Sequence, residues 1–248
     1  MKPVDAHCHL TFEQFDKDRD KLIEKTKKKV ESVAVPGVNL ESNKEVINLY
    51  NNHSKFLIPN LGLHPTYRDS FDQVKEIKKQ IKNENPPAIG EIGLDHHHIT
   101  DEKARNHQEE VFRELLELAE EMNKPIIIHS REAERKCFNI LKEYELPEVM
   151  LHCFNGTPEL AEEAASEGMK IGVTTQVLYS NRVEDIVKAL NVEDIVLETD
   201  SPYLYRGERN EPLNVVESAQ KISEIKDKSI KKVIKATTEN GREIHKSH

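Results

Sequence analysis

Histidines and carboxylates recur at the ends of short apolar segments, and their types and spacing suit metal chemistry. His7 and His9 flank Cys8 near the start of the chain. In an extended segment, residues two apart point the same way, so both imidazoles can reach one ion. A single pair of this kind is a weak signal, because two histidines can also stand together by chance. The case for a metal site therefore depends on groups elsewhere in the chain.

Four further side chains that can bind a metal stand where an apolar segment closes. They are Glu91, His129, His152 and Asp200. Each has an ordinary alternative when taken alone, because a histidine can be a buried structural residue and an aspartate can cap a turn. Six such groups at one place are difficult to explain in that way. Nitrogen and carboxylate ligands suit Mg, Mn, Zn or Ni, and six of them exceed the three protein ligands of a usual catalytic ion. The set therefore favours two divalent ions, with Glu91 as a candidate bridge.

Eight short apolar segments must position these groups, and they alternate with longer charged ones. The predicted strands are Val4–His7, Ser32–Val35, Phe56–Leu61, Ala88–Ile92, Pro125–His129, Val149–Cys153, Lys170–Thr174 and Asp194–Glu198. The clearest predicted helix is Gln108–Met122, where apolar residues recur at helical spacing. Eight strand–helix units in 248 residues predict one α/β domain over 1–248, a (β/α)₈ TIM-type barrel. The strand ends then meet at the carboxyl face, where such barrels have their active sites.

The composition restricts the class of protein. A formal net charge of −9 argues against a large non-specific electrostatic grip on nucleic acid, although metal ions can neutralise a site locally. No apolar run is long enough to cross a membrane, and the first residues contain no secretory signal. Three cysteines without such a signal indicate reduced thiols, so we expect a cytoplasmic protein. We also expect a monomer, since no additional apolar face is evident.

Motifs along nearly the whole chain resemble the TatD family of metal-dependent deoxyribonucleases, within the amidohydrolase-like superfamily. The motifs are Asp-Ala-His-Cys-His-Leu at 5–10, Gly-Leu-His-Pro at 62–65, Gly-Glu-Ile-Gly-Leu-Asp at 90–95, Ile-His-Ser-Arg-Glu-Ala at 128–133, Leu-His-Cys-Phe-Asn-Gly at 151–156 and Glu-Thr-Asp-Ser-Pro-Tyr-Leu at 198–204. The resemblance implies exonuclease-type cleavage of DNA or a related phosphodiesterase activity. It also implies that the metal ligands are His7, His9, Glu91, His129, His152 and Asp200.

The expected mechanism is hydrolysis by a water that two ions share. The first ion would be held by His7, His9, Glu91 and Asp200, and the second by Glu91, His129 and His152. We expect two catalytic residues within this set. Asp200 would accept the proton of the attacking water, and Glu91 would be indispensable as the shared ligand.

The sequence indicates the substrate-binding residues less clearly than the metal ligands. His64 follows the third predicted strand and either donates to a substrate phosphate or serves as a structural histidine. Arg206 lies on the loop after Asp200, and an arginine fork suits phosphate oxygens. Tyr203, on the same loop, either stacks on a base or packs beneath the loop.

Other polar residues have more ordinary interpretations. Asp5 and Asp95 are expected to orient metal ligands. Arg209 is expected to pair with Glu211, although it could also reach a phosphate. Arg131 either contacts phosphate or anchors the start of the following helix.

Several cysteines and histidines are expected to take no part in the chemistry. Strand alternation should turn Cys8 and Cys153 away from the site. The run 96–98 is three histidines where the family often has aromatic residues, and it is expected to be a solvated loop rather than a further ion site. His245 and His248 are expected to form a frayed tail.

Two other functions remain open at this stage. The first is a hydrolase that uses the same metal site on a small ester, lactone or cyclic amide, because a fold does not decide a substrate. A wide mouth lined by arginine favours DNA, whereas a closed apolar pocket favours a small molecule. The second is a metal-binding or scaffold protein without activity, which the presence of all six candidate ligands opposes.

Overall fold

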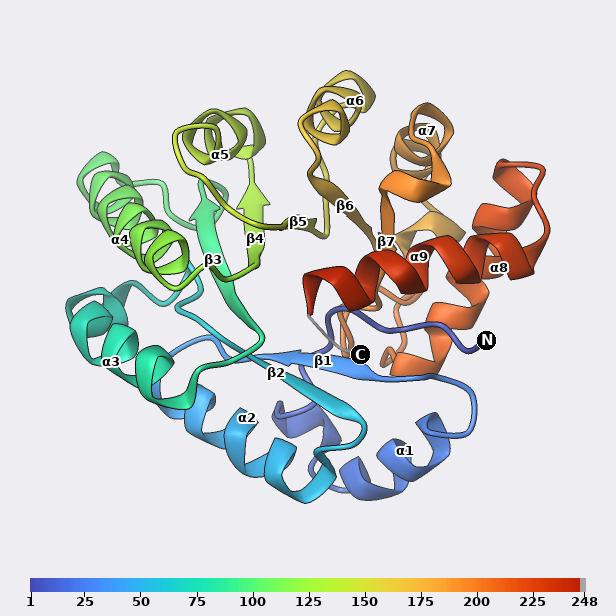
Figure 1. The fold of residues 1–248 in the computed structure, drawn as a ribbon, viewed down its shortest axis with the longest axis horizontal. Coiled ribbons are helices and arrows are strands. Elements are labelled where there is room, and N and C mark those ends of the chain that lie inside the picture. Colours follow the sequence, from blue (N-terminus) through green and yellow to red (C-terminus); the bar gives the residue numbers. More distant parts are fainter. Residues whose placement is uncertain (246–248) are drawn as a thin grey trace.

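A computed structural model describes residues 1–245. Seven parallel strands form one sheet in the order in which they occur in the chain. The strands are β1 Val33–Pro36, β2 Leu57–Leu61, β3 Ala88–Asp95, β4 Ile126–Arg131, β5 Val149–His152, β6 Lys170–Val173 and β7 Ile195–Leu197. The sheet curls, and helices follow the strands around its outside (Figure 1).

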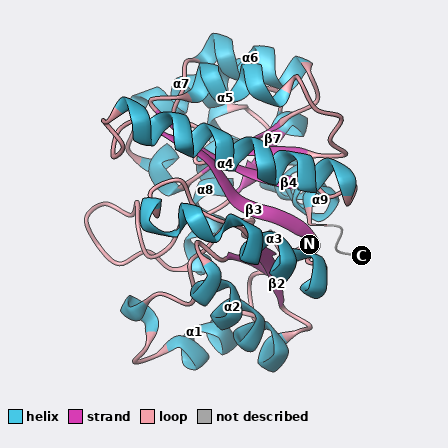
Figure 2. Ribbon diagram, turned by 90° about the vertical axis from the view of Figure 1, so that its left-hand side faces the viewer, coloured by secondary structure: helices cyan, strands magenta, loops and turns pink. Residues whose placement is uncertain are grey.

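The helices occupy most of the segments between the strands. The α-helices are α1 Arg19–Thr26, α2 Leu40–His53, α3 Val74–Glu84, α4 Glu102–Glu121, α5 Glu134–Leu141, α6 Pro158–Ser166, α7 Asn181–Ala189, α8 Val215–Ile225 and α9 Ile230–Ile244. Short 3₁₀ helices are η1 Glu13–Phe15, η2 Arg68–Gln73, η3 Thr175–Leu178, η4 Val192–Asp194 and η5 Pro212–Asn214. Figure 2 shows strands in the interior and helices at the periphery. None of these helices is long and apolar enough to span a bilayer.

The N-terminal segment 5–9 lies between β1 and β7 and closes the sheet into a (β/α)₈-type barrel. On the β1 side, the Cys8 amide donates to the Ala34 carbonyl at 3.0 Å. On the β7 side, the Ala6 amide donates to the Leu197 carbonyl at 3.0 Å. The segment makes only isolated bridges, Asp5 with Val33 and Cys8 with Ser201, instead of a regular strand. The prediction of a strand at Val4–His7 is therefore wrong, although the segment occupies the eighth position of the barrel.

The other seven predicted strands are confirmed, with shifted ends. β3 continues to Asp95, three residues beyond its predicted end. Helix α4 begins at Glu102, six residues before the predicted start. Its first turns are charged and lack apolar periodicity, and the Asp101 side chain caps them by accepting from the Ala104 amide. Capping by a side-chain oxygen satisfies a backbone donor that the helix itself leaves unpaired.

The amino ends of the strands are sealed by apolar side chains and by the end of α9. Ile244 packs into a cluster with small and aliphatic residues of the barrel interior, namely Ala6, Ala88, Ile127, Met150 and Val196. The opposite, carboxyl ends are left for polar groups.

His245 is fully buried beneath the barrel, so the prediction that it belongs to a frayed tail is wrong. Its Nε2 lies 3.1 Å from the Ala6 carbonyl oxygen. Because α9 runs as far as Ile244, the next side chain is carried under the barrel. His248 lies outside the described residues.

Candidate metal centre

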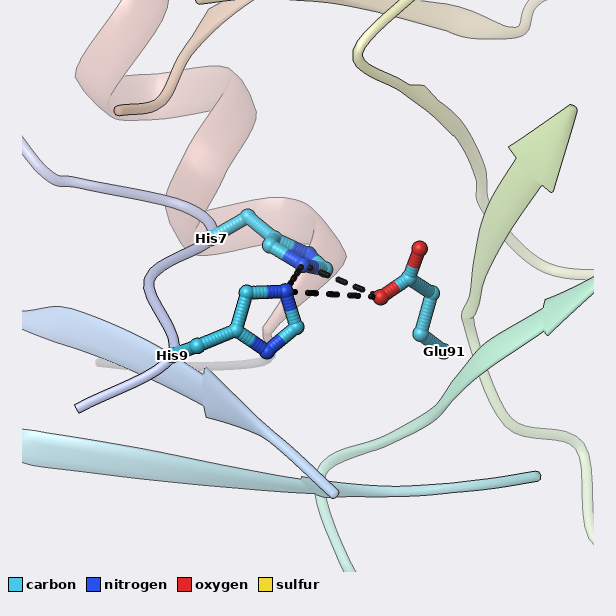
Figure 3. A group of neighbouring side chains, drawn as sticks. All are labelled: His7, His9 and Glu91. Atoms are coloured by element: carbon cyan, nitrogen blue, oxygen red, sulfur yellow. Dashed lines mark hydrogen bonds and ion pairs between the residues drawn. The ribbon is translucent and has the colours of Figure 1, made fainter. Parts of the chain in front are cut away.

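The carboxylate of Glu91 stands between two groups of histidines at the carboxyl end of the barrel. Its Oε2 lies 3.3 Å from Nε2 of His7 and 3.8 Å from Nε2 of His9 (Figure 3). Its Oε1 lies 2.9 Å from Nδ1 of His129 and 3.7 Å from Nε2 of His152. Each oxygen therefore faces its own set of ring nitrogens.

Asp200 completes the cluster from the loop after β7. Its Oδ1 lies 3.4 Å from Nε2 of His9, 3.9 Å from Nε2 of His7 and 3.7 Å from Nε2 of His152. The Asp200 amide donates to the His7 carbonyl at 2.9 Å, which ties this loop to the N-terminal segment. All six residues predicted as ligands are thus brought together.

The local structure of β3 explains why Glu91 faces the interior. Ala88 belongs to the interior cluster, and strict alternation would turn a residue three positions later to the other face. The register between β3 and β4 shifts between Ile89 and Ile92. A bulge of this kind re-aims the side chains that follow it. Glu91 is consequently directed into the barrel.

Unpaired polar atoms indicate that these residues fit a divalent ion. Oε2 of Glu91 and the Nδ1 atoms of His7 and His9 are buried and have no hydrogen-bond partner among the described residues. The Nε2 atoms of His7 and His9 lie 3.3 Å apart. Buried polar groups are almost always paired, so a carboxylate oxygen facing two convergent nitrogens lacks a partner that a cation would provide.

Three side chains of this cluster are in the protonation states that metal ligands require. Burial, and then the charge of His152, lower the pKa of His7 to about 3. Burial would raise the pKa of Glu91, but the neighbouring imidazoles His64, His152 and His7 hold it well below its usual range. Burial would likewise raise the pKa of Asp200, and hydrogen bonding to His9 lowers it. These three side chains are therefore in the forms that bind metal.

His129 and His152 differ, because the pKa of each is raised. Burial lowers the pKa of His129, but hydrogen bonds to Asp95 and Glu91 outweigh burial and raise it. His152 holds a proton in the absence of an ion. Burial lowers its pKa, but the charges of Glu198, Glu91 and Asp200 outweigh burial and raise it to about 10. Nδ1 of His152 lies 2.5 Å from Oε2 of Glu198. A metal at Nε2 must displace the proton there.

Carboxylates behind two of the histidines fix their orientation. Asp95 lies 3.0 Å from Nε2 of His129, as expected of an orienting group. Glu198, fully buried, has the same relation to His152, and sequence reasoning did not assign it this role. Its place two residues before Asp200 in the same motif was the available signal. Asp5 orients backbone instead, since it accepts from the Thr199 amide at 2.8 Å.

The cluster opens into a cavity of about 810 Å³. His64 lines it, with Nε2 only 3.3 Å from Oε1 of Glu91, so it stands at the distance of a further ligand. Arg131 and Arg68 also line it. Arg206 is exposed and lies outside the lining. Three aromatic residues, Phe12, Tyr67 and Tyr203, also line the cavity.

Arg209 is held by internal pairs. Its guanidinium forms two bonds of 2.7 Å to Asp18 and one of 3.2 Å to Glu211. The expected Glu211 pair is confirmed, and Asp18 is the partner that sequence reasoning did not supply.

Cys153 lines the cavity, so the prediction that it faces away is wrong. Its φ of 46° lies in the left-handed region, where the alternation of a strand no longer applies. In the 96–98 run, His97 pairs with Glu132 at 2.7 Å and is exposed. His98 instead contacts Oδ2 of Asp95 at 2.9 Å and lines the cavity.

Comparison with known proteins agrees with this geometry. A family model described as TatD related DNase matches residues 4–246. The chain is 40% identical over 246 residues to a protein of Methanocaldococcus jannaschii named as an uncharacterized metal-dependent hydrolase, with 96% of each chain covered. It is 34% identical to deoxyribonuclease TATDN3 of Homo sapiens, with 97% of this chain and 93% of that protein covered.

Solved structures show the same fold. A TatD homolog of Escherichia coli superposes with a TM-score of 0.86 at 27% identity, covering 97% of this chain and 96% of that one. An uncharacterized amidohydrolase of Saccharomyces cerevisiae superposes with a TM-score of 0.90 at 19% identity, covering 98% and 99%.

Proposed function

The chain belongs to the TatD family of metal-dependent hydrolases, and from this premise we propose that it is a deoxyribonuclease that hydrolyses phosphodiester bonds of DNA with two divalent ions. The observation that carries the proposal is the carboxylate of Glu91, whose two oxygens face two separate sets of histidine nitrogens. The printed name of the human relative supports DNA as the substrate.

The candidate ligands divide into two sets around Glu91. The first ion would be held by His7, His9, Glu91 and Asp200, and the second by Glu91, His129 and His152. His64 is close enough to Glu91 to join the second set or to donate to the substrate. When bound, a pair of divalent ions supplies Lewis acidity and an acidified water, and stabilises both attacking and leaving oxygens. The donor set of nitrogen and carboxylate suits Mg, Mn, Zn or Ni.

Asp200 is the proposed proton acceptor. Its side chain is 14% exposed, whereas that of Glu91 is 1% exposed, so water reaches Asp200 from the cavity. Its pKa lies below the usual value despite burial, because His9 donates to it and nearby imidazoles attract its charge. It is therefore a carboxylate at neutral pH, as a general base must be.

The cavity supplies contacts for the substrate. Arg131 lies at the end of β4 and lines the cavity without a carboxylate partner in residues 1–245. A free guanidinium suits two phosphate oxygens. We propose Arg131 and His64 as contacts to the cleaved phosphate, and Arg206, on the exposed loop beyond Tyr203, as a contact to more distant nucleotides.

We propose that the protein is cytoplasmic and monomeric. Cys8, Cys137 and Cys153 form no disulfide, which supports a reducing, cytoplasmic location. We propose that the protein acts as a monomer, since all six candidate ligands come from one chain.

Cleavage of single-stranded DNA labelled at its 5′ or its 3′ end tests the function, with Mg, Mn, Zn and Ni added separately. We expect metal-dependent shortening from one end, abolished by chelator. Glu91→Gln should lose at least a thousandfold in rate, because the amide cannot bridge two cations. Glu132→Gln, an exposed change at the rim, is the matched control and should leave the rate unchanged.

Two results would contradict the proposal. Protein that contains metal but cleaves no DNA would exclude the nuclease and favour the small ester, lactone or cyclic amide. Cleavage by Glu91→Gln at the wild-type rate would exclude the two-ion scheme.

A further inference from the structure

A second hollow, of about 460 Å³, adjoins the catalytic cavity. The two share a wall made of Phe12, Val38, Tyr67 and Tyr203. The remaining lining comes from segment 11–16 and from the start of α2. A substrate held at the metal centre can therefore extend into this hollow without leaving the protein surface.

The hollow and the cavity differ in the cationic groups that line them. Arg68 and Arg131 line the cavity together with the carboxylates Glu91, Asp95 and Asp200, which we assign to the metal centre. The hollow is lined by Glu13, Asp16 and Glu45, and by no lysine or arginine of the described chain. Asp16 is paired with a neighbouring arginine, which leaves two carboxylates without a cation. Like charges repel a phosphate here, so the part of a nucleotide that fits this hollow is its uncharged base.

The shared wall presents aromatic faces to solvent. Tyr67 is 37% exposed and Tyr203 46% exposed. The Tyr67 ring meets the His64 ring edge to face, with centroids 6.1 Å apart, so it stands beside a residue proposed to contact the cleaved phosphate. Aromatic side chains on a protein surface are the usual platform on which unpaired bases stack.

Phe12 connects this wall to the metal centre. Its ring lies parallel to that of His9, with centroids 4.5 Å apart and planes 15° apart. It also meets Tyr203 edge to face at 6.2 Å. The wall therefore begins one ring away from a proposed metal ligand, so a base next to a phosphate held at the metal centre can reach it.

We propose that this second hollow is a nucleobase subsite, in which an unpaired base next to the cleaved phosphodiester stacks on Tyr203 and Tyr67. The inference rests on the proposed function and adds to it. A base within a duplex already stacks on its neighbours, and releasing it costs free energy. The enzyme therefore prefers single strands or frayed ends to blunt duplexes, and bases to abasic sites.

Fluorescence of 2-aminopurine tests the subsite apart from turnover, because stacking quenches it and the protein contains no tryptophan. The metal-loaded enzyme is titrated with single-stranded DNA that carries 2-aminopurine beside a cleavage-resistant phosphorothioate. Quenching is expected for wild type and for Tyr203→Phe, which retains the ring. It should be lost in Tyr203→Leu and reduced in Tyr67→Leu. Tyr179→Leu is the matched control, since Tyr179 is 48% exposed and lines neither hollow.

A kinetic comparison supplies the second readout. Wild type should cleave an ordinary end about tenfold faster, in kcat/KM, than an end whose base is missing, the size expected of one stacked base. Tyr203→Leu should bring this ratio close to one by slowing only the ordinary end.

The outcomes separate the two proposals. If DNA is cleaved but both leucine variants quench and discriminate like wild type, the subsite is overturned and the nuclease stands. If DNA is neither bound nor cleaved with any metal, both are overturned. If Tyr203 is needed for quenching but DNA is not cleaved, the hollow binds a base, and both the nuclease and the role of the hollow beside a cleaved phosphodiester are overturned.

Discussion

Nε2 of His129 lies 3.0 Å from Oδ2 of Asp95, and this contact turns Nδ1 of the same ring toward Glu91. Burial would raise the pKa of Asp95, but hydrogen bonds from His129 and from the His98 amide hold it well below its usual range. The group is thus a carboxylate that keeps the proton of His129 on Nε2. Nδ1 faces Glu91. Burial lowers the pKa of His129, but the bonds to Asp95 and Glu91 outweigh burial and raise it, so a metal at Nδ1 would compete with a proton there.

Asp95→Asn should therefore weaken binding of the second ion. The amide is a poorer acceptor for Nε2–H, and it can also present its own donor to the ring. Loss of such a partner typically reduces metal affinity by about tenfold to a hundredfold. Calorimetric titration of chelator-treated protein measures the change. Unaltered affinity and stoichiometry, equal to those of the rim variant Glu132→Gln, would show that Asp95 does not position the ligand.

The proton on His152 makes metal binding depend on pH. Its pKa of about 10 means that the metal-free protein is protonated there at pH 8. Binding at Nε2 displaces that proton, so affinity should rise with pH up to about 10. About one proton should be released per ion at this site, which titration in buffers of different ionisation enthalpy measures.

Glu198→Gln is the variant that tests the cause of this release. The charge of Glu198 is the largest influence that raises the pKa of His152, so its removal should lower that pKa and reduce the protons released at pH 8. The same proton count in variant and wild type would contradict the assignment. His97→Gln, at an exposed site, should leave the count unchanged.

The ends of apolar strands identified the six candidate ligands, because the topology of a parallel barrel brings those ends together whatever the details. The directions in which side chains point within the site were harder to predict from the sequence. Cys153 and Asp200 both have positive φ, 46° and 55°, and turn their side chains where strand alternation does not apply. The register shift in β3 that directs Glu91 inward likewise has no local sequence signal.

Contacts between distant segments were not predictable from local pattern. Asp18 pairs with Arg209 across 191 positions, and His245 meets Ala6 across 239. Such pairs depend on how helices pack around the finished barrel. Spacing along one segment carries no information about them.

Arg131 and Arg206 should contribute differently to DNA binding. Arg131 lines the cavity and Arg206 does not. Arg131→Ala should weaken binding of a trinucleotide and of a longer oligonucleotide alike, and reduce the dependence on salt by about one unit of slope. Arg206→Ala should affect only the longer substrate. Affinities at several salt concentrations measure both, and an Arg206 effect on the trinucleotide would show that this residue reaches the catalytic cavity.

His245 should make the stability of the fold fall in mild acid. Burial lowers its pKa to about 4, although the bond to the Ala6 carbonyl opposes this shift. In the unfolded chain the pKa is about 6.5. Between these values the unfolded state binds a proton that the folded state does not, so the free energy of unfolding decreases as pH falls from about 6.5 to about 4. A gap of this size corresponds to about 3 kcal/mol, and below pH 4 the contribution becomes constant.

Urea unfolding of wild type and His245→Phe from pH 7.5 to pH 4.5 isolates this residue, because all other titrating groups are common to both. The variant loses the bond to Ala6 at every pH, so it should be less stable near neutrality. The difference should shrink as pH falls, since phenylalanine cannot take up the proton in the unfolded state. His97→Phe should keep the wild-type slope. A stability difference that is constant over the whole range would show that His245 titrates normally in the folded protein.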